Sequence, residues 1–227
     1  NRISTQNGGN EVMRVSVQER WIAFVAMAAL LLGSAGGTRV LAAEVDSDLA
    51  PPMRSTIPPP NLKVSSWLLM DAATGLTLAA NNADAPVEPA SLTKLMTAYI
   101  VFREIQRETL SLDDEVVVSE KAWRTEGSRM FIEAGDKVKV NDLLMGLIVQ
   151  SGNDAAVALA EHIAGSEEGF ADLMNQTAAE LGMANSHFMN SAGLPHPDHY
   201  TTARDVTVLT RAIISGQPDH YSRYAVR

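Results

Sequence analysis

One serine in this 227-residue sequence has a neighbour that suits nucleophilic catalysis. In the stretch EPASLTKLMTAYIVF, residues 88–102, Ser91 stands three residues ahead of Lys94. On a helix this spacing is close to one turn, which puts both side chains on one face within hydrogen-bonding reach. A serine hydroxyl becomes a good nucleophile when a base removes its proton, and a lysine kept neutral by burial is such a base. The pair therefore predicts a serine nucleophile with a lysine base.

The surroundings of this pair leave two interpretations open. Lys94 lies between Leu92, Leu95 and Met96 in an apolar segment, where a surface lysine is less expected. Against this, serine is a favoured N-cap, so Ser91 would then only begin the helix that follows. Ser-x-x-Lys alone is too short a motif to decide between a catalytic pair and a cap.

A second polar triplet, Ser151-Gly152-Asn153, interrupts an apolar helical pattern in LIVQSGNDAAVALA. Polar groups in a buried neighbourhood cost stability unless they are paired. In a catalytic interpretation Ser151 relays a proton to the leaving group, and the Asn153 amide holds a substrate carbonyl and Lys94. An ordinary turn between two helices, with Asn153 as the cap, explains this stretch equally well when it is taken alone.

Together the two motifs are more specific than either one. Ser-x-x-Lys followed by Ser-x-Asn gives two of the three signatures of the serine penicillin-recognising enzymes, and each occurs once. From residue 68 to residue 224 the sequence resembles the D-alanyl-D-alanine carboxypeptidases of the low-molecular-mass penicillin-binding proteins. The matching stretches are DAATGLTLAANNADAPVEPASLTKLMTAY, KAWRTEGSRMF, LIVQSGNDAAVALAEHIAGSEEGFADLMN, LGMANSHFMNSAGL and HYTTARDV.

The resemblance implies an activity and the residues that carry it. Such enzymes remove the terminal D-alanine from peptidoglycan pentapeptides ending in D-Ala-D-Ala through an acyl-enzyme, and they bind β-lactam antibiotics covalently. By motif, Ser91 is the nucleophile and Lys94 its base, Ser151 is the second catalytic hydroxyl, and Gly152 and Asn153 bind substrate. No metal and no organic cofactor is expected.

The third signature of that family, Lys-Thr/Ser-Gly on a strand of the sheet, does not occur in this sequence. Its five lysines are Lys63, Lys94, Lys121, Lys137 and Lys139, and none precedes Thr-Gly or Ser-Gly. We therefore expect an N-terminal fragment of the enzyme, inactive by itself, that lacks the β-rich second domain. Membrane association would depend on a C-terminal amphipathic anchor that the fragment also lacks.

The apolar patterns predict the elements that position these residues. Two strands with a turn at residues 73–75 form a hairpin, and helical periodicity begins at Leu92. Short strands are expected within residues 111–140, followed by helices on both sides of residues 151–153, a helix ending at Gly182, and a helix with a Thr202–Asp205 capping box. These patterns indicate a mixed architecture, and the resemblance implies an α+β fold of the serine β-lactamase/transpeptidase-like class: an antiparallel sheet flanked by helices plus a helical subdomain, truncated before the last sheet strands.

The N-terminal region predicts export. Arg14 and Arg20 precede the apolar run WIAFVAMAALLL, and small residues follow it, which is typical of a secretory signal peptide. We expect residues 1–43 to be upstream residues and signal peptide, residues 44–62 a Pro-rich linker and residues 63–227 a partial peptidase domain. We expect the exported protein in the periplasm or cell envelope, where it could also associate with the inner membrane. A net charge of −9 and no Lys/Arg-rich run argue against a nucleic-acid partner.

Other motifs are weaker. His196 and His199 in PHPDHY suggest a metal site, but the prolines predict a solvated loop there, and His162 and His187 are expected to be packed and hydrogen-bonded. The enzymatic alternative is a serine β-lactamase, although Gly152 stands where class A enzymes usually have Asp and no Glu-x-x-Leu-Asn segment follows Ser151. An inactive penicillin-binding relative is the non-enzymatic alternative.

Overall fold

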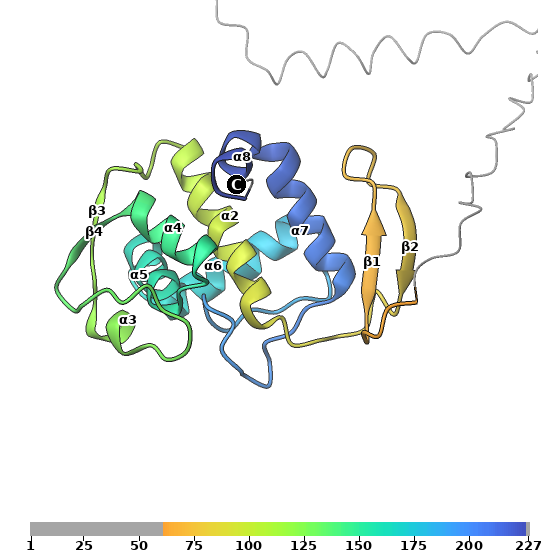
Figure 1. Cartoon of the computed structure of the whole chain (residues 1–227), viewed down its shortest axis with the longest axis horizontal. Helices are drawn as coiled ribbons and strands as arrows, with labels where there is room; N and C mark the ends of the chain where they lie inside the picture. Colours follow the sequence, from red (N-terminus) through yellow and green to blue (C-terminus); the bar gives the residue numbers. More distant parts are fainter. Residues whose placement is uncertain (1–60, 226–227) are drawn as a thin grey trace, which may run out of the picture. The chain divides into compact units, whose positions relative to one another are not determined.

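Helices make up about half of residues 61–225, the part of the chain that this computed structural model describes (Figure 1). The predicted signal peptide and the predicted linker up to residue 60 lie outside it. No helix in the described part is both long and apolar enough to cross a membrane. The elements in chain order are β1 Trp67–Met70, β2 Thr77–Asn81, η1 Ala90–Leu92, α2 Thr93–Gln106, β3 Glu115–Val117, α3 Glu120–Arg124, β4 Lys137–Lys139, α4 Val140–Val149, α5 Asn153–Ala164, α6 Glu167–Leu181, α7 Ala203–Gly216 and α8 Pro218–Ala225.

The predicted hairpin is confirmed. Strands β1 and β2 pair antiparallel, and Gly75 takes a left-handed conformation (φ +77°) in the turn between them. The Asp71 carboxylate closes this turn by accepting a hydrogen bond from the Thr74 backbone N–H at 2.7 Å. Helix α7 lies beside β1 (Figure 1), and Arg211 on α7 donates to the Ala72 carbonyl at 3.0 Å. The hairpin is therefore tied to the helices at its turn.

Helix α2 lies between two groups of buried apolar side chains. Val101 and Phe102 belong to the group that also contains residues of α4 and α5, whereas Met96 and Ile100 belong to the group formed with α6 and α7. Apolar residues at steps of three and four therefore cover more than one face of this helix. As a result the N-terminus of α2, where Ser91 and Lys94 stand, is fixed by packing on both sides.

The predicted helix breaks are also confirmed. Helix α4 ends at Val149 and α5 begins at Asn153, and between them Ser151 takes a left-handed conformation (φ +55°). Helix α6 ends at Leu181, and Gly182 (φ +78°) terminates it in the left-handed conformation that favours glycine. The short strands expected within residues 111–140 are β3 and β4, which pair antiparallel.

The predicted capping box of α7 is only half present. Thr202 accepts a hydrogen bond from the Asp205 N–H at 3.1 Å, as an N-cap should. The Asp205 carboxylate, however, accepts from the Asn185 N–H and the Ser186 hydroxyl, both at 2.8 Å, instead of returning to Thr202. The prediction of a reciprocal box was wrong because a tertiary partner competes successfully for the carboxylate.

The buried face of α6 offers a test of this packing. Phe170 is fully buried between α2, α6 and α7, whereas Phe131 is 77% exposed. We expect Phe170→Ala to lower the free energy of unfolding by about 3–5 kcal/mol because it leaves a cavity in the core. Phe131→Ala is the matched control and should change it by less than about 0.5 kcal/mol. Denaturant unfolding of both variants measures the difference, and equal effects would contradict this packing.

Candidate active site

Ser91 lies in the middle of η1, immediately before α2. The N-cap position of α2 is occupied by Leu92, and no side chain caps that helix. The alternative interpretation of Ser91 as a helix cap is therefore wrong, and its hydroxyl is not engaged with the backbone of α2. Ala90, the residue before it, takes a left-handed conformation (φ +45°), which is strained for a residue with a side chain. This sharp turn holds Ser91 at the beginning of the helix.

Lys94 is buried, as its apolar neighbours predicted, with 6% of its surface exposed. Its Nζ atom lies 3.4 Å from Ser91 Oγ and donates to the Ala192 carbonyl at 2.7 Å. Burial lowers the pKa of the amine from 10.5 to about 8. At pH 7 this raises the neutral fraction from about one molecule in three thousand to about one in ten. The arrangement gives Ser91 a base at one turn's distance.

Ser151 lines the same cavity as Ser91 and Lys94. This cavity has a volume of about 210 Å³, and α2, α7 and α8 supply most of its other walls. The left-handed conformation of Ser151 places it in the short connection between α4 and α5, and Gly152 follows with its N–H bonded to the Gly146 carbonyl at 3.0 Å. The structure thus brings Ser91, Lys94 and Ser151 to one cavity, whereas Gly152 and Asn153 are not among the residues that line it.

Asn153 is held differently from what its motif predicted. Its backbone N–H donates to the Ser128 carbonyl at 2.7 Å and its Nδ2 to the Glu126 carbonyl at 2.6 Å. The expected contact with Lys94, in which Asn153 Oδ1 would accept from the amine, is not among these hydrogen bonds, because Lys94 Nζ donates to the Ala192 carbonyl instead. Gly127 makes the hydrogen bond to Glu126 possible, since a Cβ there would lie 2.7 Å from Asn153 Nδ2. Asn153 therefore joins the segment 126–128 to the site.

Asp154, the next residue, holds the neighbouring part of the same segment. Its fully buried carboxylate accepts hydrogen bonds from the backbone N–H groups of Met130 at 3.0 Å and Phe131 at 2.9 Å. The sequence predicted Asp154 only as a first-turn residue of α5, which it also is. A carboxylate that accepts several backbone donors fixes their positions strongly. Asn153 and Asp154 together hold residues 126–131 against the connection that carries Ser151.

The carbonyl that holds Lys94 belongs to a tight loop of residues 190–194. Asn190 Oδ1 accepts from the backbone N–H of Gly193 at 2.7 Å and of Leu194 at 2.9 Å. Gly193 takes a left-handed conformation (φ +87°), and a Cβ on it would overlap the carbonyl oxygen of Ala90. This loop therefore touches both ends of the Ser-x-x-Lys turn, through Gly193 at Ala90 and through Ala192 at Lys94.

Residues 53–227 match the D-alanyl-D-alanine carboxypeptidase family of serine peptidases. This match covers more than half of the chain. The chain belongs to this family. Among curated relatives, it is 41% identical over 199 residues to the D-alanyl-D-alanine carboxypeptidase DacC of Escherichia coli K12, which covers 85% of this chain and 49% of that protein. It is 45% identical over 173 residues to DacD of the same organism, which covers 74% of this chain and 45% of that protein.

Solved structures of carboxypeptidases and penicillin-binding proteins share the fold. The structure of DacD from Francisella tularensis superposes with a TM-score of 0.71 at 47% identity, over 74% of this chain and 41% of that one. Penicillin-binding protein 5 from Haemophilus influenzae gives a TM-score of 0.71 at 39% identity, over 73% and 49%. The predicted α+β, transpeptidase-like fold is confirmed. The chain spans about half the length of the relatives it matches.

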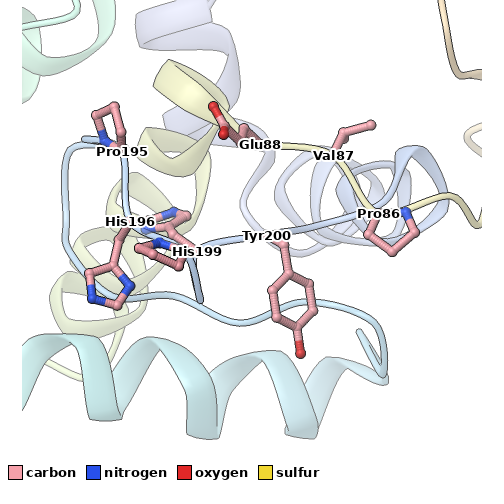
Figure 2. A pocket seen from close by; sticks show the side chains of 8 residues that line it. Pro86, Val87, Glu88, Pro195, His196, His199 and Tyr200 are labelled. Carbon is pink, nitrogen blue, oxygen red and sulfur yellow. The ribbon is translucent and has the colours of Figure 1, made fainter.

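The histidine loop of this carboxypeptidase-family chain differs in one respect from its prediction. Figure 2 shows that the segment from Pro195 to Tyr200 runs beside Pro86–Glu88, which leads to η1. Residues of both segments line a hollow of about 440 Å³. The loop has no regular structure, as predicted, and His196 is exposed. His199 is not solvated, however, because only 3% of its surface is exposed.

His199 supports the turn that carries Ser91. Its Nδ1 accepts from the Met189 backbone N–H at 3.3 Å, so the neutral ring carries its proton on Nε2 and donates to Thr93 Oγ1 at 2.9 Å. Burial first, and the neighbouring His187 and His196 second, lower the pKa of His199 to about 4. The ring is therefore neutral at physiological pH and serves as a hydrogen-bonding support.

The two histidines that the sequence predicted to be packed and hydrogen-bonded, His162 and His187, differ in the structure. His187 is half-buried and hydrogen-bonded through Nδ1 to the Asp198 carbonyl at 2.7 Å, as predicted. His162 is exposed near the C-terminal end of α5, so its prediction as a packed residue was wrong. Its helical position faces solvent although most of the helix around it is apolar in sequence. Within residues 61–225, no three His, Asp or Glu side chains gather closely enough to hold a metal ion.

A glycine substitution tests the contact between the 190–194 loop and the Ser91 turn. Gly193 and Gly182 are both left-handed, but a Cβ on Gly182 would meet no atom within 4 Å. We expect Gly182→Ala to lower the free energy of unfolding by about 1 kcal/mol, the cost of the conformation. Gly193→Ala should cost at least about 2 kcal/mol more because the backbone of Ala90 must move. Thermal or denaturant unfolding compares them, and equal losses would show that the two segments are not in contact.

Proposed function

We propose that this chain carries the acylating half of a serine D-Ala-D-Ala carboxypeptidase that acts on peptidoglycan pentapeptides. The observation that carries the proposal is the buried pair of Ser91 and Lys94, with Nζ 3.4 Å from Oγ and a lysine pKa lowered by burial to about 8. Family membership supports the same reaction, since the two relatives of which this chain covers 49% and 45% are D-alanyl-D-alanine carboxypeptidases.

The geometry suggests how each step proceeds. Lys94 takes the hydroxyl proton while Ser91 Oγ forms a bond to the carbonyl carbon between the two terminal D-alanines. The backbone N–H of Ser91 helps to stabilise the oxyanion that develops. Ser151, at the same cavity, passes a proton to the departing D-alanine nitrogen as the peptide C–N bond breaks. Water then adds to the acyl carbon, the ester bond to Ser91 Oγ breaks, and a proton from that water returns to Ser91.

Gly152 and Asn153 are the proposed substrate-binding residues. They lie between Ser151 and the segment 126–128, where Asn153 is fixed by hydrogen bonds to the Ser128 and Glu126 carbonyls. A side chain held this firmly offers its remaining polar atoms to a ligand without loss of conformational freedom. Residues 1–227 contain no Lys-Thr-Gly or Lys-Ser-Gly, so the proposal assigns no residue of this chain to the substrate's terminal carboxylate.

β-Lactam binding follows from the same nucleophile. Attack of Ser91 Oγ on the lactam carbonyl opens the ring C–N bond and leaves the antibiotic attached as an ester. A structural relative, penicillin-binding protein D2 from Listeria monocytogenes, has been solved with ampicillin bound, and it superposes with a TM-score of 0.64 at 28% identity. We propose that Ser91 is acylated by penicillins in this way.

The proposed site of action is the cell envelope. Residues Trp21–Leu32, between arginines and small residues, support export through a signal peptide, and a peptidoglycan substrate requires an exported enzyme. Association with the inner membrane stays a prediction from the family resemblance. Fractionation of the host cell, followed by N-terminal sequencing of the protein, tests export and cleavage after Ala42 or Ala43.

Covalent labelling tests the nucleophile. The complete product of the gene should form an ester with a fluorescent penicillin that survives denaturing electrophoresis, and Ser91→Ala should lose the labelling by at least about a thousandfold. Ser119→Ala, which removes the hydroxyl that caps α3 and donates to Glu161, is the control outside the site and should label normally. Labelling that persists in Ser91→Ala would contradict the assignment of Ser91 as the nucleophile. Release of D-alanine from a pentapeptide supports the carboxypeptidase, whereas rapid penicillin turnover without it supports a β-lactamase.

The buried lysine predicts a pH dependence of acylation. Lys94 acts as a base only when neutral, and burial lowers its pKa to about 8. The acylation rate should therefore rise about tenfold per pH unit up to about pH 8 and level off above it. Lys94→Arg should abolish acylation at every pH, because a guanidinium stays charged. Stopped-flow measurement with a chromogenic cephalosporin follows the rate, and a flat profile between about pH 6 and pH 9 would contradict a lysine base.

A further inference from the structure

A buried carboxylate lies behind the loop that holds Lys94. Glu167 is the first residue of α6, directly after the N-cap Ser166, and is only 9% exposed. Its Oε1 atom accepts two hydrogen bonds from Ser191, one from the backbone N–H at 3.1 Å and one from the hydroxyl at 2.9 Å. Ser191 immediately precedes Ala192, whose carbonyl accepts from Lys94 Nζ at 2.7 Å. Glu167 is thus one residue removed from the group that orients the base.

The other oxygen of Glu167 is anchored as well. Lys121 Nζ, from α3, lies 3.1 Å from Glu167 Oε2 and 2.8 Å from Glu168 Oε1. The side chains of the two glutamates differ in exposure, at 11% for Glu167 and 78% for Glu168. Glu168 pairs with the lysine from the solvent side, while Glu167 lies between the lysine and the loop. The position of Glu167 at the start of a helix also favours its negative charge.

The loop has a second hydrogen bond on the opposite side. The Thr97 hydroxyl, one turn after Lys94 on α2, donates to the Ser191 carbonyl at 2.7 Å. Ser191 is therefore held at its N–H and hydroxyl by α6 and at its carbonyl by α2. With Ser191 hydrogen-bonded and Gly193 against Ala90, both neighbours of Ala192 are held. The Ala192 carbonyl between them is therefore restricted near the position at which it accepts from Lys94.

We propose that Glu167 is a positioning residue for acylation: through Ser191 it fixes the Ala192 carbonyl, which holds the Lys94 amine towards Ser91. This inference rests on the proposed function, because it concerns the same nucleophile and base. Removal of the carboxylate leaves two donors of Ser191 without a partner in a buried place, so the loop must shift to find new partners. A displacement of about 1 Å in a reacting group can lower a rate by about a hundredfold.

The test compares three variants of the complete gene product with the unaltered protein. Glu167→Ala removes both acceptor oxygens, Glu167→Gln keeps an oxygen that can accept from Ser191, and Glu168→Ala removes the other partner of Lys121. Stopped-flow reaction with a chromogenic penicillin separates the acylation rate constant from the non-covalent dissociation constant. Melting temperatures are recorded for every variant.

We expect Glu167→Ala to lower the acylation rate constant by about tenfold to a hundredfold while the non-covalent dissociation constant changes less than about threefold. Glu167→Gln should recover to within about threefold of the unaltered protein, and Glu168→Ala should react normally. Equal acylation by Glu167→Ala and Glu168→Ala would overturn the inference. So would a loss shared equally between the rate constant and the dissociation constant, since that indicates a general distortion of the site.

Two further outcomes remain decidable. If Glu167→Ala does not fold, Ser191→Ala takes its place: loss of the hydroxyl donor alone should lower the acylation rate constant about threefold to tenfold, and an unchanged rate overturns the inference. If the unaltered protein does not react with penicillin at all, the proposed function fails. If it reacts normally and the variants do not differ from it, only the role of Glu167 fails.

Discussion

The hydrogen bond from the Lys94 amine to the Ala192 carbonyl, 2.7 Å long, joins two parts of the chain that are 98 residues apart. An amine buried to this degree must have a partner, because an unpaired polar group away from water costs several kcal/mol. The partner is a backbone carbonyl, which carries no charge that would hold the ammonium form strongly. Lys94 is therefore satisfied as a donor while burial still lowers its pKa, and this combination is what a general base requires.

The rest of the structure can be understood as the support of that one contact. Helix α2 is fixed between two apolar groups, so Lys94 has little freedom to move away from the loop. On the other side, Asn190 accepts hydrogen bonds within the loop 190–194, and Ser191 donates to Glu167. Gly193 of the same loop packs directly against Ala90. The neutral His199 adds a hydrogen bond to Thr93 in the same turn. Polar networks that are fully satisfied in this way specify one arrangement of a buried site.

The sequence predicted the elements well, because helical periodicity and turn residues are local signals, and three of the residues that it singled out, Ser91, Lys94 and Ser151, line one cavity. Helical periodicity located α2 and α6, and the polar triplet located the break before α5. The supporting contacts left no such signal. The Ala192 carbonyl belongs to the backbone, so the residue type at position 192 does not predict its role. Ser191 donates to Glu167, which lies 24 positions away in the sequence. The partners of Asn153 and Asp205, and the exposure of His162, were likewise decided by tertiary neighbours. The stretch NSAGL gave one local indication of a turn at this loop, because Asn and Gly are typical turn residues.

Ala90 and Ser151 each bear a side chain in a left-handed conformation, one just before the proposed nucleophile and the other at the proposed proton relay. Such a conformation costs about 1–2 kcal/mol relative to glycine. Selection of the protein for heat resistance alone would therefore favour replacements at both positions that relax the backbone. Glycine at position 151 would remove the Ser151 hydroxyl. Glycine at position 90 would make the turn that positions Ser91 more flexible. Gains in thermal tolerance for this enzyme family are better sought on the outer faces of α6 and α7, away from these two turns.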